Sequence, residues 1–412
     1  MSNIVKIGDI TASCLGKMLD AKKNKGEYHP YLANINVRWG SFDLDDLPLM
    51  RFENSEHERY GLKKGDLVMC EGGEPGRCAI WKEEVPNMKI QKALHRIRAK
   101  EDLLDIRYLY YWFLLAGQQN LLKGYFTETT IKHLPGDKLK EIELNLPSLE
   151  QQQKIADVLT PIDDRISNNQ KIIQTLTRYA KTIYDYWFVQ FEFPNADGKP
   201  YKSSGGEMVW CEELKTAIPK GWSVFPLSSF MTIKTSTVNP KNHSNEIFEH
   251  YSIPAFDDNN YPVFETGASI ESGKYRVVPE AILVSKLNPQ FKRVWNPLCE
   301  TENAICSTEF MVYVPNEIWM RPYCFGVLNC DAFHSHMKAK AISSTGSRKR
   351  IQPDVSASFE CALPAKEIIE GFCEIYSPIM EKQKKLCKEN QQLIELRDWL
   401  LPLLMNGQAT IE

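Results

Sequence analysis

The sequence lacks the signals that identify several classes of protein. No run reaches the roughly 18 consecutive apolar residues that a membrane helix needs, and the first residues, MSNIVKIGDI, contain no apolar signal-peptide core. The 11 cysteines are scattered, and none of the closest pairs has the Cys-x-x-Cys spacing of a zinc site. We therefore expect reduced thiols, no bound metal and a cytoplasmic location.

Catalytic motifs are also scarce. There is no GxSxG, HExxH or Walker motif. Residues 71–76, Glu-Gly-Gly-Glu-Pro-Gly, lack the strand–GxGxxG–helix context of a nucleotide-binding loop. Residues 288–291, Asn-Pro-Gln-Phe, superficially resemble the Asn-Pro-Pro-Phe/Tyr motif of adenine methyltransferases, but the third residue is Gln and no glycine loop for S-adenosylmethionine accompanies them. We expect a chain without catalytic activity or cofactor of its own.

Overall charge gives no indication of a nucleic-acid partner. The net charge is −3, with 43% hydrophobic and 25% charged residues, which is ordinary for a globular protein. Phosphate binding requires only local basic density, so a weakly acidic chain can still bind DNA on one face. At 412 residues the chain is long enough for two to four domains.

The sequence repeats itself at a fixed offset. Leu146-Pro147 is echoed by Leu363-Pro364, and Pro161-Ile162 by Pro378-Ile379, both 217 residues later. Lys171 and Leu176 have counterparts in Lys388 and Leu393 at the same offset. An ungapped repeat over some 40 residues indicates an internal duplication: two globular halves, each followed by a helical segment.

The helical segments carry a heptad pattern. Residues 150–188 are predicted to be helical, with a fresh start or kink at Thr160-Pro161, because Thr is a good N-cap and Pro suits the first helical position. Apolar residues then recur at alternating spacings of three and four, as in a coiled coil, with a polar break at Asn169. Two such seams in one chain can pair antiparallel. The expected spacer positions are Ile162, Ile166, Asn169, Ile173, Leu176, Ile183, Ile379, Leu386, Leu393 and Leu400.

Both globular halves mix short apolar runs with turn signals. Residues 67–70 and 78–81 are predicted strands and residues 103–115 a helix. The second half follows with strands at 281–284 and 310–314. Each half is therefore an α/β or α+β domain, and the Gly-, Pro-, Asn- and Ser-rich residues between them indicate a linker.

Basic and amide side chains beside turns are the candidates for DNA contact. Arg and Lys can contact guanine or phosphate, and Gln and Asn can contact adenine. A solvated surface charge is the alternative for each of them. The candidates are Arg77, Gln91, Lys92, His95, Lys132, His133, Lys286, Asn288, Lys292, Arg293, Arg348, Lys349 and Arg350.

The duplicated segments resemble those of a known family. LPSLEQQQKI at residues 146–155 is similar to the "LPPLxEQxxI" that opens the conserved helices of type I restriction–modification specificity subunits. WFVQF at residues 187–191 resembles the "SWFVDF" that closes their central helix. CEGGEPGR at 70–77 and VSKLNP at 284–289 resemble two classes of their target recognition domain. In the second helix, residues 366–369 depart from the usual Leu-x-Glu-Gln.

The resemblance implies a domain layout. It places target recognition domains at residues 1–146 and 222–362, conserved helical regions at 147–192 and 363–412, and a linker at 193–221. The expected fold is two α/β (α+β) domains separated by two long helices that form an antiparallel coiled coil.

The resemblance also implies a function. The chain would recognise a bipartite, asymmetric double-stranded DNA site and dock two methyltransferase subunits and the restriction subunits. S-adenosylmethionine, Mg²⁺ and ATP would belong to those partners. Two alternatives stay open on the residues alone: a fused DNA-modifying enzyme, and a coiled-coil scaffold without a role in DNA binding.

Overall fold

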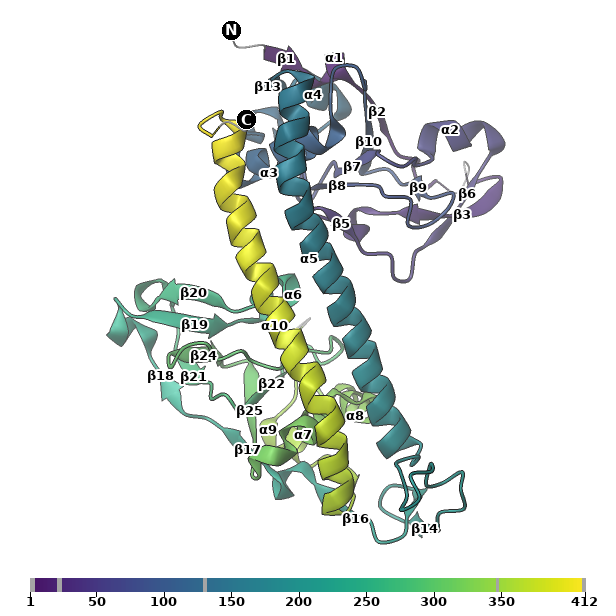
Figure 1. Cartoon of the computed structure of the whole chain (residues 1–412), viewed down its shortest axis with the longest axis vertical. Coiled ribbons are helices and arrows are strands. Elements are labelled where there is room, and N and C mark those ends of the chain that lie inside the picture. The colour runs from purple at the N-terminus through teal and green to yellow at the C-terminus, as the bar shows by residue number, and fades with distance from the viewer. Residues whose placement is uncertain (1–3, 21–23, 129–131, 346–347, 410–412) are drawn as a thin grey trace. The chain divides into compact units, whose positions relative to one another are not determined.

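The computed structural model describes residues 4–20, 24–128, 132–345 and 348–409, and these form two compact units. Unit 1 comprises Met1–Asn168 and Gln392–Glu412, and unit 2 comprises Asn169–Gln391. Each unit combines one globular half with part of each of two long helices, α5 (Leu149–Tyr184) and α10 (Lys366–Met405), drawn in teal and yellow in Figure 1.

Unit 1 is built on small antiparallel sheets. The central sheet has the strand order β2-β10-β7-β8, and a second sheet has the order β6-β3-β9. Strand pairs β1–β13, β4–β5 and β11–β12 complete the unit. The strands are β1 (Ile4–Lys6), β2 (Thr11–Leu15), β3 (Glu27–Leu32), β4 (Val37–Arg38), β5 (Ser41–Phe42), β6 (Leu49–Phe52), β7 (Leu67–Cys70), β8 (Cys78–Ile80), β9 (Lys89–Ile90), β10 (Leu94–Ala99), β11 (Thr127–Glu128), β12 (Lys132–His133) and β13 (Glu143–Asn145).

Helix α3 (Ile106–Gln118) forms the centre of the apolar core of unit 1. Asp105 caps it by accepting a hydrogen bond from the backbone N–H of Arg107, and its apolar face buries Leu109 and Phe113. The same core includes Leu159 of α5 and Leu401 of α10. The shorter helices of the unit are α1 (Ile7–Ile10), α2 (His57–Tyr60) and α4 (Gly136–Glu141).

Unit 2 has a central sheet of order β17-β25-β22-β23 and a second sheet of order β18-β21-β24-β19-β20. Its strands are β14 (Met208–Cys211), β15 (Thr216–Pro219), β16 (Ser223–Pro226), β17 (Met231–Lys234), β18 (Thr237–Val238), β19 (Ile247–Tyr251), β20 (Val263–Thr266), β21 (Lys274–Arg276), β22 (Ile282–Ser285), β23 (Val294–Trp295), β24 (Ala304–Ser307), β25 (Phe310–Pro315), β26 (Ile342–Thr345), β27 (Arg348–Arg350) and β28 (Glu360–Leu363). Its helices besides α5 and α10 are α6 (Ile253–Asp258), α7 (Arg321–Asn329), α8 (Asp331–Lys340) and α9 (Pro353–Ala357).

The two units share one topology, which confirms the predicted internal duplication and the mixed α and β fold class. The sheet β2-β10-β7-β8 corresponds to β17-β25-β22-β23, and the pair β1–β13 corresponds to β16–β28. In both units one strand of the second sheet has an antiparallel neighbour on one side and a parallel neighbour on the other. In unit 1, β3 pairs antiparallel with β6 and parallel with β9. In unit 2, β19 pairs antiparallel with β20 and parallel with β24.

Helix α5 continues through Pro161, so the predicted fresh helix start at that residue is wrong. A proline inside a helix removes one backbone hydrogen bond and costs about 3 kcal/mol. Burial of Leu159, two residues earlier in the helix, in the core of unit 1 helps to offset that cost. The helix ends in a π-helical turn at Asp185–Val189. Helix α10 likewise includes Pro378 without a break.

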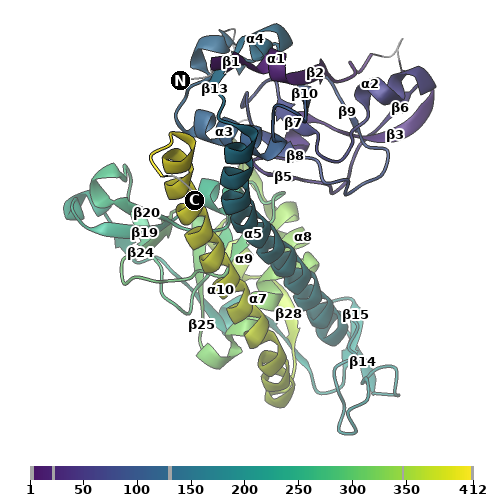
Figure 2. The same cartoon turned by 45° about the horizontal axis from the view of Figure 1, so that its top comes forward.

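Within each unit α5 and α10 run in opposite directions, as predicted (Figures 1 and 2). Two polar residues of α10 have partners on α5. In unit 1, Arg397 pairs with Asp163 at 2.9 Å. In unit 2, Gln383 donates a hydrogen bond to Thr177 Oγ1 at 2.8 Å. Asn169 is fully buried in unit 2, and neither atom of its amide has a hydrogen-bond partner among the described residues.

The predicted spacer residues differ in how far they are buried. Ile166, Asn169, Ile379 and Leu386 are buried. The remaining positions are half-buried: Ile162, Ile173, Leu176, Ile183, Leu393 and Leu400. An antiparallel helix pair packed against a globular half explains this gradient, because only the positions also covered by the half lose all contact with water.

Residues 193–221, which the sequence suggests as a linker, carry regular structure. They contain the hairpin of β14 and β15, which follows the end of α5 in the chain. Phe193 stacks on Tyr201 with ring centroids 4.7 Å apart and on Trp222 at 5.2 Å. Cys211 and Ile218 are buried in the core of unit 2. The Gly and Pro residues of this segment therefore form turns of a folded region.

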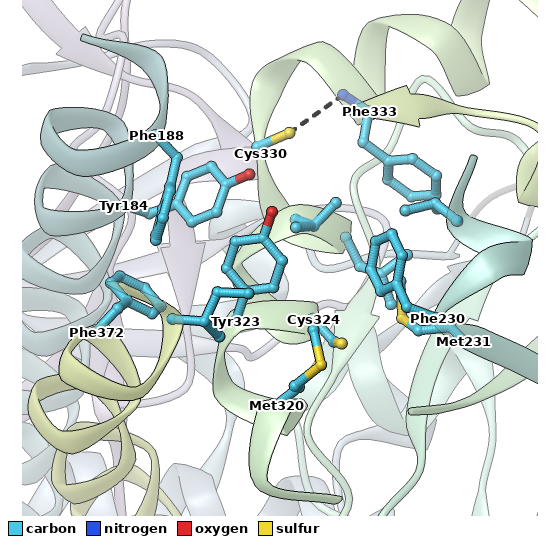
Figure 3. Close-up of a cluster of buried hydrophobic side chains, with 14 of the residues drawn as sticks. Tyr184, Phe188, Phe230, Met231, Met320, Tyr323, Cys324, Cys330, Phe333 and Phe372 are labelled. Carbon is cyan, nitrogen blue, oxygen red and sulfur yellow. Dashed lines mark hydrogen bonds between the residues drawn. The ribbon is translucent and has the colours of Figure 1, made fainter. Parts of the chain in front are cut away.

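An aromatic cluster holds the helices onto the second half within unit 2 (Figure 3). Phe188, just after α5, lies 4.8 Å from Phe372 of α10 and 5.0 Å from Tyr323 of α7, measured between ring centroids. Tyr184 belongs to the same group, with its ring centroid 5.2 Å from that of Phe188 and 6.1 Å from that of Phe372. Because aromatic rings bury large apolar areas, this cluster is a main source of cohesion between the helical and globular parts of unit 2.

Substituting Phe188 by Ala should therefore destabilise unit 2 strongly. Removing a buried Phe costs roughly 3–5 kcal/mol through lost burial and the cavity left behind. Urea unfolding monitored by fluorescence should show a clearly lower midpoint for Phe188→Ala. Phe264→Ala is the matched control, because Phe264 is an exposed ring on β20 and surface substitutions usually change stability by less than about 0.5 kcal/mol. Equal midpoints for the two variants would contradict this description of the core.

Candidate nucleic-acid interface

In unit 2 the loop between β22 and β23 is joined to the β26–β27 hairpin by backbone hydrogen bonds. The N–H of Asn288 donates to the carbonyl oxygen of Lys349 at 2.7 Å, and the N–H of Lys349 donates to Asn288 Oδ1 at 3.0 Å. Leu287 and Arg350 form an antiparallel bridge beside this contact. Asn288 has a φ of 50°, a left-handed conformation that Asn tolerates better than most residues. Loop and hairpin thus form one surface, which we name surface 2.

The same arrangement occurs in unit 1. The loop between β7 and β8 forms an antiparallel bridge from Gly72 to His133 of β12, and the N–H of Leu134 donates to the carbonyl oxygen of Glu71 at 2.7 Å. A Cβ atom at Gly72 would lie only 2.9 Å from the His133 ring, so any larger residue there would have to displace that ring. This loop and the β11–β12 hairpin form surface 1. His133 lies 217 residues before Arg350, the offset of the duplicated helices.

The candidates in the first half fall into two groups. Lys92 and Lys132 are exposed, and Gln91 and His133 are half-buried beside them. Arg77 pairs with Glu74 at 2.8 Å and also donates to the carbonyl oxygen of Asn34. His95 is buried, and its Nε2 lies 2.9 Å from the carbonyl oxygen of Leu134. Arg77 and His95 therefore organise the loop and hairpin from within.

The candidates in the second half divide in the same way. Arg348 and Lys349 are exposed on β27. Arg350 forms an ion pair with Glu309 at 2.7 Å, and this hydrogen-bonded pairing lowers the pKa of the Glu309 carboxyl. Arg293 binds Asp257 through both Nε, at 2.6 Å, and Nη2, at 2.7 Å.

Three further candidates of the second half are half-buried: Lys286, Asn288 and Lys292. Lys292 lies 3.6 Å from Asp331, and burial lowers its pKa. Sequence alone could not separate Lys292, Arg293 and Arg350 from the exposed cations, because the acidic partner of each of these three lies 36 or more residues away in the chain.

Exposed apolar residues on the long helices form a second candidate surface. In unit 2, Ile172 and Tyr179 are exposed on α5 seven residues apart, which places them on one face of the helix, and Tyr186 is exposed in the π-helical turn that follows α5. In unit 1, Leu396 and Trp399 are exposed on α10, and Trp399 retains 64% of its accessible surface. Leu396 is the repeat counterpart of Tyr179 at the 217-residue offset. Exposed apolar stripes of this kind indicate protein-binding surfaces.

Two further searches of the described residues gave negative results. They contain no group of three or more His, Cys, Asp or Glu side chains that could hold a metal ion. No helix among them is long and apolar enough to cross a membrane.

His95 yields a prediction about pH. Burial lowers its pKa in the folded state, so the unfolded chain, with a pKa near 6.5, binds the proton more readily. Stability should therefore be independent of this group above pH 6.5 and fall as the pH drops below that value. Unfolding of wild type and His95→Gln between pH 8 and pH 5 tests the point, with Gln keeping a donor for the Leu134 carbonyl. The variant should lose less stability than wild type on acidification, and an equal loss would contradict the prediction.

Comparison with known proteins agrees with this picture. The family model described as "Type I restriction modification DNA specificity domain" matches residues 2–178. The MjaIX specificity subunit of a type I restriction enzyme from Methanocaldococcus jannaschii is 24% identical over 85% of this chain and 78% of its own length. The HindI specificity subunit from Haemophilus influenzae is 24% identical over 85% of this chain and 88% of its own.

A solved structure supports the fold. The S subunit of a type I restriction–modification system from M. genitalium aligns over 98% of this chain and 96% of its own, with a TM-score of 0.54 at 17% identity. The repeated topology and the long helices are thus accompanied by a family match over residues 2–178 and a structural alignment over 98% of the chain. The chain therefore matches the type I restriction–modification DNA specificity domain over residues 2–178 and is similar to type I specificity subunits over 85% of its length.

Proposed function

We propose that this chain selects a bipartite, asymmetric DNA sequence for a type I restriction–modification complex and catalyses no reaction itself. Surface 1 recognises one half of the site and surface 2 the other. The observation that carries this proposal is the repeated bridge between loop and hairpin, Gly72 to His133 in unit 1 and Leu287 to Arg350 in unit 2. It presents a loop and basic residues on equivalent scaffolds in each half.

The two kinds of residue on these surfaces suit the two kinds of DNA contact. Exposed cations on the hairpins, Lys132 in unit 1 and Arg348 and Lys349 in unit 2, are placed to bind phosphates, which gives affinity without sequence information. The adjoining loops differ in sequence between the halves, as readers of two different half-sites would. The target recognition domains accordingly correspond to residues 1–146 and 222–362.

The exposed stripes suit two copies of one partner. Tyr179 on α5 and Leu396 on α10 are repeat counterparts, so each helix offers an equivalent apolar face. We assign these faces to two methyltransferase subunits, with the restriction subunits joining that assembly. S-adenosylmethionine would bind to the methyltransferases, and Mg²⁺ and ATP would serve the partner subunits. The complex would act in the cytoplasm, where the cell's DNA lies.

Exchange of one half tests whether the halves recognise DNA independently. Residues 1–146 are replaced by the matching region of a related specificity subunit, and the chimera is assembled with the methyltransferase. Genome-wide mapping of methylated adenines should show one half-site changed and the other retained, because surface 2 is intact. The reciprocal exchange of residues 222–362 serves as the matched control. A change in both half-sites after either exchange would contradict the proposal.

The helices should determine the distance between the half-sites. A helix rises about 1.5 Å per residue, so one added heptad lengthens each helix by about 10 Å and keeps the seam in phase. Insertion of seven residues after Asn169 and after Asn390 should lengthen the DNA spacer by about one to three base pairs, at about 3.4 Å per base pair. The two insertion points lie at the same level of the helix pair. Thr177 of α5 and Gln383 of α10 are hydrogen-bonded to each other. Because the helices are antiparallel, eight residues before Thr177 and eight residues after Gln383 lead to Asn169 and to Gln391, which is next to Asn390.

Methylation mapping with the double insertion provides the measurement, and insertion into α5 alone is the control. The single insertion shifts the two helices out of register and should prevent assembly with the partner. Full methylation activity with an unchanged spacer in the double insertion would show that the helices do not set the distance.

A further inference from the structure

The loop of surface 2 ends in an exposed tip formed by Gln290 and Phe291. Phe291 keeps 57% of its accessible surface, and Gln290 beside it is exposed. The preceding Pro289 is buried. An amide and an aromatic ring therefore project from a loop whose base is packed into the domain.

Contacts on both sides hold this tip in place. Before it, Asn288 binds the backbone of Lys349 through two hydrogen bonds. After it, the Arg293 guanidinium is held by both carboxylate oxygens of Asp257 and lies 5.1 Å from the centroid of the Phe291 ring. Arg–carboxylate pairs with two hydrogen bonds fix geometry as well as adding energy. The tip is thus anchored by the β26–β27 hairpin on one side and by α6 on the other.

We propose that Gln290 and Phe291 form the base-reading tip of surface 2 and recognise A·T-containing sequence. This inference rests on the proposed function and specifies which atoms carry it. The Gln290 amide can donate to adenine N7 and accept from adenine N6, the pairing that the geometry of a major groove favours for Gln. The Phe291 ring packs against the methyl group of a thymine at the neighbouring position. Neither side chain is charged, so neither should release counterions or contribute to the salt dependence of binding.

The cations around the tip have a different role. Arg293 is neutralised by Asp257 and orients the Phe291 ring. Arg348 and Lys349 are exposed on the adjoining hairpin and bind the phosphate backbone of the DNA. The motif Asn288-Pro289-Gln290-Phe291 therefore combines a clamp, Asn288 and Pro289, with a reader, Gln290 and Phe291. In surface 1 the loop at residues 71–77 carries Glu, Gly and Pro instead, so the two halves should recognise different bases.

Methylation mapping and DNA binding of single variants test this assignment. Gln290→Ala, Phe291→Ala and Phe291→Leu are each assembled with the methyltransferase partner. Gln290→Ala should relax an adenine at one position of one half-site, and Phe291→Ala should relax a neighbouring thymine position. Affinity for the intact site should fall by about 5- to 150-fold. Phe291→Leu should have a smaller effect, because leucine still offers an apolar contact. The other half-site should be unchanged.

The salt dependence of binding separates base contacts from phosphate contacts. Lys349→Ala should reduce the slope of log affinity against log salt by roughly one unit and weaken binding to all sequences alike. Gln290→Ala and Phe291→Ala should leave that slope unchanged. Phe264→Ala, an exposed ring in the same unit, is the control for loss of an aromatic side chain and should change neither motif nor slope.

Two results would overturn the assignment. One is an unchanged motif and affinity in both Gln290→Ala and Phe291→Ala, when wild type methylates a two-part motif. The other is a reduced salt slope in these variants, which would make the tip a phosphate contact. A wild-type complex that recognises no two-part motif would refute the proposed function itself, so the two failures are distinguishable.

Discussion

The structure depends on the burial of two long helices against the globular halves. Helices α5 and α10 gain most of their stability from packing of an apolar face rather than from helix propensity, as helices in proteins generally do. Each gains stability where it packs on a domain: Leu159 and Leu401 enter the core of unit 1, and Phe188 and Phe372 enter that of unit 2. Each of these two long helices therefore contributes to both compact units. Neither globular half can be separated from the helix pair without losing part of the core of its unit.

Duplication explains why one chain can carry two such units with different chemistry. The backbone contacts that join loop to hairpin are equivalent in the two halves, from Gly72 to His133 and from Leu287 to Arg350. The side chains on top of this scaffold are free to diverge, because the bridges involve the backbone. Surface 1 carries a glycine-rich loop, and surface 2 carries a clamped loop ending in Gln290 and Phe291. An asymmetric DNA site is the natural partner of such a protein.

The local hydrophobic pattern and the internal repeat of the sequence predicted much of this fold. The 217-residue offset gave the two halves and the two helices, and the apolar runs gave β7, β22 and β25 nearly to the residue. Pro161 was misjudged because burial of Leu159 in the core of unit 1 helps to offset the lost hydrogen bond. The segment 193–221 suggested a linker because its turns are dense, whereas the stacking of Phe193 on Tyr201 and Trp222 is a tertiary contact. For the same reason sequence could not show that Asp257 holds Arg293 or that Phe291 stays exposed.

Photocrosslinking from equivalent positions of the two surfaces tests the central claim most directly. Lys132 and Lys349 are exposed repeat counterparts on β12 and β27, 217 residues apart. Each is replaced in turn by a photoreactive amino acid, and the complex with its partner subunits is irradiated on its own DNA site. Crosslinks from position 132 should map to one half of the site and those from position 349 to the other. Crosslinks from both positions to the same half-site, or to neither, would contradict the account.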